Sequence, residues 1–113
     1  MIYAHFIKQN NNILKFTLSG HAESGPQGHD LVCAAVSALA IGTANNLTRI
    51  ANVQPEIDAN EEEGGFLEIV LPEVVDQTQQ ERGQILLQSL YYSLSDLETE
   101  YGEYISVSDS TTK

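Results

Sequence analysis

The chain changes from loop to helix within residues 20–37, whose sequence is GHAESGPQGHDLVCAAVS. Glycine, proline, serine and histidine dominate the first half, and these residue types favour turns and loops. Residues 34–40 are rich in alanine, the best helix former. Asp30 lies at the boundary, where its carboxylate could cap unpaired backbone N–H groups. The pattern predicts a helix that begins at about Leu31 and holds Cys33 in its first turn.

Cys33 is the only cysteine of the chain and the strongest candidate for a reactive group. The positive end of a helix dipole favours an anion, and the thiolate is the nucleophilic form of cysteine. His21 can act as the base that takes the thiol proton. His29 is closer in sequence, but it lies in the predicted loop, whereas His21 follows a predicted strand and is better anchored. Together, Cys33 and His21 predict a cysteine nucleophile with its base.

The rest of the chain alternates between strand and helix patterns. Runs of β-formers bounded by turn residues predict strands, and apolar residues at helical spacing predict helices. The predicted order is strands at 2–8 and 13–19, a helix at 31–51, strands at 53–59 and 66–71, a helix from Thr78 to about 100 and a strand at 104–107. We therefore predict an α/β (α+β) fold of one domain over residues 1–113. Two helices pack on a mostly antiparallel sheet in the order ββαββα plus a short terminal strand, with a frayed tail at 108–113.

Charge and composition limit the partners and the compartment. Sixteen acidic residues against five Lys and Arg give a net charge of −11. This charge argues against binding a nucleic-acid backbone and favours a basic partner, with the acidic run 58–63 as one attracting segment. We expect no membrane segment and no secretory leader. A single cysteine cannot form an internal disulfide, which fits a cytoplasmic protein.

The segments GHA at 20–22 and DLVCAAVS at 30–37 resemble the signature of the ribosomal-processing cysteine protease family, Prp. The resemblance implies an endopeptidase that removes an N-terminal extension from a bacterial large-subunit ribosomal protein, so that the ribosome can mature. It implies a catalytic dyad of His21 and Cys33, with Gly20, Asp30 and Ser37 as the other motif positions. It also implies a homodimer, and a loop between His21 and Cys33 that becomes ordered over the substrate. From the residues themselves we expect no cofactor and no metal.

Several alternatives remain open from the sequence. A non-catalytic acidic adaptor for a basic ribosomal or assembly protein would have the same net charge. A metal site of His21, His29 and Cys33 is disfavoured because only one thiol is available. Asp30 could cap the helix or orient the His21 imidazole. Ser37 lies one helical turn after Cys33, where it could donate a hydrogen bond near the site or allow close helix packing.

Overall fold

The first two strands form a hairpin around a turn of two asparagines. β1 (Ile2–Gln9) pairs antiparallel with β2 (Asn12–Ser19), and Asn10 and Asn11 between them have φ angles of 51° and 67°. Two successive positive φ angles are the geometry of a type I′ turn, which asparagine tolerates better than most residues. The predicted hairpin is confirmed.

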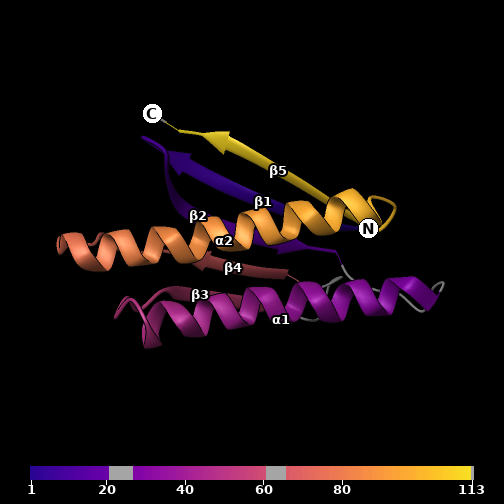
Figure 1. Cartoon of the computed structure of the whole chain (residues 1–113), viewed down its shortest axis with the longest axis horizontal. Coiled ribbons are helices and arrows are strands. Elements are labelled where there is room, and N and C mark those ends of the chain that lie inside the picture. The colour runs from indigo at the N-terminus through magenta and orange to yellow at the C-terminus, as the bar shows by residue number, and fades with distance from the viewer. Residues whose placement is uncertain (21–26, 61–65, 113) are drawn as a thin grey trace.

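Five strands form one sheet in the part of the chain that the computed structural model describes, residues 1–20, 27–60 and 66–112. Their order is β3-β4-β2-β1-β5, with β3 (Glu56–Asn60) and β4 (Phe66–Val70) paired antiparallel. β5 (Ile105–Thr111) pairs in parallel with β1 at the opposite edge (Figure 1). The predicted mostly antiparallel sheet is confirmed.

Both edge strands differ from their predicted bounds. β3 starts later than predicted, because Val53 donates its N–H to the carbonyl of Leu47 in the preceding helix and Pro55 has no N–H to donate. β5 is longer than predicted, and the expectation of a frayed tail at 108–113 is wrong for residues 108–111. Parallel pairing with β1 continues to Thr111 and holds this segment in the sheet.

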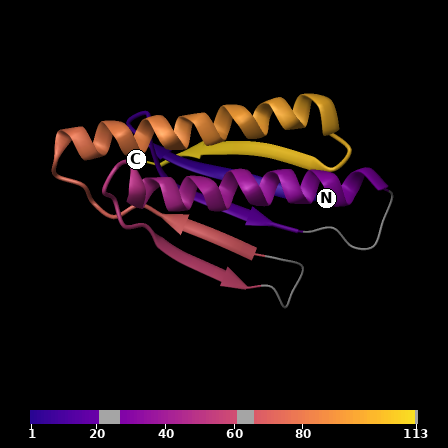
Figure 2. The same ribbon diagram turned by 60° about the horizontal axis from the view of Figure 1, so that its bottom comes forward.

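Two long helices cover the same face of the sheet. α1 (Gln27–Arg49) and α2 (Gln77–Tyr101) lie side by side and run in opposite directions (Figures 1 and 2). The start of α1 and the end of α2 therefore lie at the same end of the molecule. β2 also ends there, which brings the two halves of the sequence motif to one place (Figure 2).

The N-terminal cap of α2 differs from the predicted capping box. Thr78 lies inside the helix, and the cap is Asp76, whose side chain accepts a hydrogen bond from the Gln79 N–H at 2.9 Å. Aspartate and threonine both cap helices, so the sequence offered two starts two residues apart. The earlier start adds hydrogen-bonded backbone to the helix without losing the cap.

The core lies between the helices and the sheet, and aliphatic side chains and two phenylalanines fill it. Phe6 and Phe16 stack across β1 and β2 with ring centroids 4.8 Å apart. The buried residues of this cluster are Ile2, Ala4, Phe6, Ile13, Phe16, Leu18, Val32, Val36, Ala40, Ala44, Leu47, Ile69, Leu87, Leu90, Leu94 and Ile105. Both helices and all strands except β3 contribute to it.

α1 is more apolar than the sequence analysis allowed. The segment Leu31–Arg49 has a mean hydropathy of 1.5, and by length and composition alone it could cross a membrane. This corrects the expectation that no segment is long and apolar enough. In the structure, one face of α1 packs into the core, as helices at the centre of globular domains do, yet only 28% of the segment is buried.

Candidate active site

Gly20 ends β2 in a conformation that only glycine adopts easily. Its φ angle is +80°, and a Cβ atom at this position would overlap the carbonyl oxygen of Met1. The main chain of β2 therefore passes directly against the start of β1 as it leaves the sheet. A side chain here would require the backbone to move, which explains glycine at this motif position.

α1 begins about one turn earlier than the sequence predicted. Its first residue is Gln27, so Asp30 lies within the first turn and is not the N-cap. Gly28 favours a loop, but its cost of about 1 kcal/mol in a helix is small beside the stability of a long, packed helix. The first turn of α1, where backbone N–H groups have no partner within the helix, therefore lies one turn before the thiol.

Cys33 lies in the second turn of α1, not in the first as predicted. Its side chain is half-buried and packs against the hydrophobic core. The helix dipole acts mainly within the first turn, so the predicted help from the helix end is weaker at this position. The thiol is held by packing and remains accessible on one side.

Ser37 lies one turn after Cys33 and is exposed. Its hydroxyl has no hydrogen-bond partner among the described residues, so neither predicted role, a bond to nearby backbone or close helix packing, is supported. Exposure beside a half-buried thiol leaves this hydroxyl accessible to a bound ligand.

Half-buried apolar side chains gather where α1 begins. The last turns of α2, which hold the partly buried Leu97 and Tyr101, lie at the end of the molecule where α1 begins (Figure 1). We call this region the thiol end: Gly20, the first two turns of α1 and the last two turns of α2. The sequence analysis missed the α2 residues, because a helical apolar stripe does not reveal which end of another helix it will meet.

Two predicted site features lie outside the described residues. These are His21 and the loop residues 22–26, so the proposed pairing of His21 with Cys33 stays a prediction. His29 lies in the first turn of α1 and not in a loop. Among the described residues, no group of three His, Cys, Asp or Glu side chains is arranged to hold a metal ion.

Comparison with known proteins decides the family. The sequence matches the family model Peptidase_Prp, described as cysteine protease Prp, over residues 1–106. The chain belongs to the Prp family of cysteine proteases. It is 33% identical over 98 residues to the ribosomal processing cysteine protease Prp of Bacillus subtilis, covering 87% of each chain.

Solved structures share the Prp fold. SMU.848 from Streptococcus mutans superimposes with a TM-score of 0.89 at 30% identity, covering 99% of this chain and 96% of that one. The essential Prp protease of Staphylococcus aureus has been solved with a substrate peptide (TM-score 0.83, 27% identity) and with a covalently linked product peptide (0.81, 29%). Each alignment covers 97% of this chain and 100% of the S. aureus chain. The chain is thus a cysteine protease of the Prp family, with two helices on one mixed sheet.

Proposed function

We propose that this protease removes an N-terminal extension from a bacterial large-subunit ribosomal protein. The observation that carries the proposal is Cys33, the only thiol of the chain, held half-buried at the thiol end in a family whose relatives process ribosomal proteins. A net charge of −11 suits a basic polypeptide substrate, which a ribosomal protein is.

In the proposed reaction, His21 takes the proton of the Cys33 thiol and the thiolate attacks the scissile carbonyl carbon. The resulting tetrahedral intermediate collapses as the peptide C–N bond breaks, and His21 gives its proton to the leaving amine. Water then adds to the thioester, and the carboxylate product leaves with the thiol restored. The N-terminal fragment is thus carried on Cys33 as an acyl-enzyme.

Asp30 is proposed to support His21 rather than to cap α1. The position of Asp30 supports this proposal, because α1 begins at Gln27, three residues earlier. A carboxylate that holds the imidazole in position is the role of the third group in other hydrolases.

A homodimer is also proposed, and the exposed face of α1 supports it. Residues 31–48 contain no charged side chain, and Leu31 and Ile41 on this helix are 65% and 54% exposed. When two copies of a chain with a net charge of −11 associate, contact through an uncharged surface avoids placing like charges directly against each other. Sedimentation equilibrium is expected to give twice the chain mass, and a monomer at all concentrations would contradict this proposal.

A cleavage assay distinguishes the protease from the alternative, a non-catalytic acidic adaptor. The wild-type chain is incubated with the precursor of the ribosomal protein, and the products are identified by mass spectrometry. We expect one cut, and we expect Cys33→Ala and Cys33→Ser to bind the precursor without cutting it. Tight binding without cleavage by the wild-type chain would instead favour the adaptor.

The two histidines provide a second test of the dyad. We expect His21→Ala to lower kcat by about a hundredfold or more, the usual cost of losing a general base. His29→Ala should retain most of the activity. The reverse order of effects would assign the base to His29.

A further inference from the structure

The two edges of the sheet differ in how far the rest of the molecule closes them. At the β5 edge, the Glu98 carboxylate on α2 accepts the Val107 N–H at 2.7 Å, and Tyr91 donates its hydroxyl to Asp109 at 2.9 Å. α2 thus occupies an outward backbone group of this edge, the Val107 N–H. At the β3 edge, by contrast, the described chain pairs β3 only with β4.

β3 is exposed along its whole length. All five residues from Glu56 to Asn60 are exposed, and Ile57 is 53% exposed although it pairs with the fully buried Ile69 of β4. An edge strand turns every second N–H and C=O outward, where a further strand can pair with them. The β3 edge therefore has both the backbone groups and an apolar side chain that an added strand can use.

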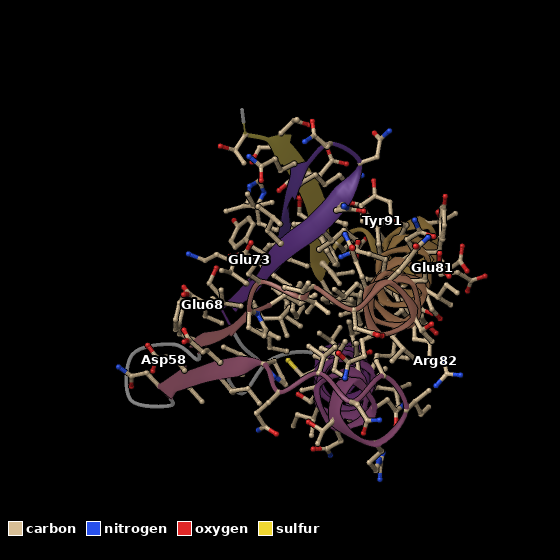
Figure 3. The ribbon with its side chains drawn as sticks, turned by 90° about the vertical axis from the view of Figure 1, so that its left-hand side faces the viewer. Asp58, Glu68, Glu73, Glu81, Arg82 and Tyr91 are labelled. Atoms are coloured by element: carbon tan, nitrogen blue, oxygen red, sulfur yellow. The ribbon has the colours of Figure 1, made fainter. Side chains whose placement is uncertain are left out.

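The side chains on the two faces of β3 indicate which side chains an added strand should carry. Asp58 lies beside Glu68 of β4, and Figure 3 shows both on the side of the sheet away from the helices. Lys15 pairs with Glu68 at 3.2 Å, whereas Glu56 and Asp58 have no ion-pair partner among the described residues. A strand added here meets carboxylates on the open face and Ile57 on the helix face.

Charge selects the occupant of this edge. A second copy pairing antiparallel through β3 would bring Glu56 and Asp58 close to the same residues of its partner, and like charges across strands are destabilising. A basic segment would instead be attracted to the carboxylates of Glu56 and Asp58. β3 also runs toward the thiol end, so a segment along it leads toward Cys33 (Figure 2).

We propose that the outer edge of β3, from Glu56 to Ala59, accepts a basic, extended segment of the polypeptide substrate as a sixth strand. This inference rests on the proposed function, because the bound segment belongs to the chain that is cut. Backbone hydrogen bonds to β3 supply the affinity, and the carboxylates of Glu56 and Asp58 select lysine or arginine on alternate residues of the substrate. The edge would hold the substrate in extended form before the scissile bond reaches the thiol.

Amide hydrogen exchange tests the strand addition directly. The probe is a synthetic peptide that spans the cut site of the precursor and carries lysine on alternate residues, added to the Cys33→Ala protein so that it is not cleaved. We expect outward-facing amides of β3 to exchange at least tenfold more slowly with the peptide bound, while β5 amides keep their rate. Unchanged β3 exchange at saturating peptide, or protection at β5 instead, would overturn the proposal.

Matched variants separate local pairing from general charge attraction. We expect Asp58→Lys to lower kcat/KM for the lysine peptide about fivefold, in the range of a lost surface ion pair with added repulsion. Glu81→Lys makes the same charge change on an exposed residue near the start of α2, away from the thiol end, and should lower kcat/KM less than twofold. Equal losses of kcat/KM in the two variants would show that only long-range charge attraction acts, and would overturn the proposed contact at Asp58.

The wild-type chain shows which proposal has failed. If it cleaves the unmodified precursor while the β3 amides stay unprotected, the strand addition is wrong and the protease function stands. If it cleaves no precursor, the proposed function is wrong, and the strand addition falls with it because the bound segment would not be a substrate.

Discussion

The two helices are attached to the sheet in different ways. α2 reaches the sheet through side-chain hydrogen bonds: Gln84 bonds both the N–H and the C=O of Ile13, and Glu98 and Tyr91 bond residues of β5. Leaving Cys33 aside, the side-chain hydrogen bonds described for α1 stay within that helix or reach the segment after it, at Val53. α1 is instead positioned by packing of its buried apolar residues in the core.

This difference suggests a division of labour between the helices. Specific hydrogen bonds fix α2 against β2 and β5, so α2 holds the fold together. α1 carries the thiol on one side and an uncharged, exposed surface on another. The reactive thiol thus lies on α1, the helix that is held by packing. Substitutions in the contacts of α2 should lower stability, whereas substitution of the thiol should lower activity.

The largest effect on stability is expected at Gly20, where the chain leaves β2 against Met1. Gly20→Ala forces a side chain into a φ of +80° and against the Met1 carbonyl, which should lower the free energy of unfolding by at least about 2 kcal/mol and reduce cleavage. Gly42→Ala in α1 is the control, since nothing lies within 4 Å of the new Cβ. It should raise stability by about 0.5–1 kcal/mol in urea denaturation. Equal stability of the two variants would refute the backbone argument.

The next effect concerns the attachment of α2. Gln84→Ala removes both partners of the Ile13 backbone, at 2.7 and 2.9 Å, and should cost about 1–3 kcal/mol. Gln88→Ala, one turn later and exposed, should change stability by less than about 0.5 kcal/mol. Chemical denaturation measures both, and a neutral Gln84→Ala would show that packing alone holds α2.

The smallest effect is a pH dependence at the junction of α2 with β5. The hydrogen bond to Asp109, together with burial and the negative charge of that carboxylate, raises the pKa of Tyr91 above its ordinary value of 10.0. The folded state thus favours the neutral phenol, so its contribution is complete below about pH 10 and is lost as the pH rises through the folded-state pKa.

Tyr91→Phe should therefore lose less stability than the wild type between neutral pH and pH 11, while Tyr92→Phe, an exposed neighbour, should behave as the wild type does. The measurement is the free energy of unfolding in urea at several pH values. Parallel pH profiles for the wild type and Tyr91→Phe would show that the hydrogen bond from Tyr91 to Asp109 does not help to hold α2.

The sequence predicted which helices and strands form, and it identified the motif. It predicted less well where these elements begin and end and how they contact one another. Alternating and helical periodicity identified five strands and two helices, because both helices and every strand except β3 place apolar residues in the core. The start of α1 was placed late because Gly28 and His29 favour a loop locally, and tertiary packing outweighed that preference. The length of β5 depended on pairing with β1, a contact between opposite ends of the chain that local patterns do not encode.

The candidate site shows the same limit. Motif residues indicated Gly20 and Cys33, and the structure gives Gly20 a steric reason. Sequence could not show that the last turns of α2 would border the thiol end, nor that Asp30 lies inside a helix. These facts depend on how α1 and α2 pack together.

A paired measurement of stability and cleavage on Cys33→Ala and Gln84→Ala tests the central claim most directly. Cys33→Ala should keep an unfolding free energy within about 1 kcal/mol of the wild type, as expected for a half-buried small side chain, and lose all detectable cleavage of the precursor. Gln84→Ala should lose stability and, under conditions where it is folded, cleave at a rate close to that of the wild type. Cleavage by Cys33→Ala at a rate near the wild-type rate would contradict the account, because the thiol on α1 would then not be the nucleophile.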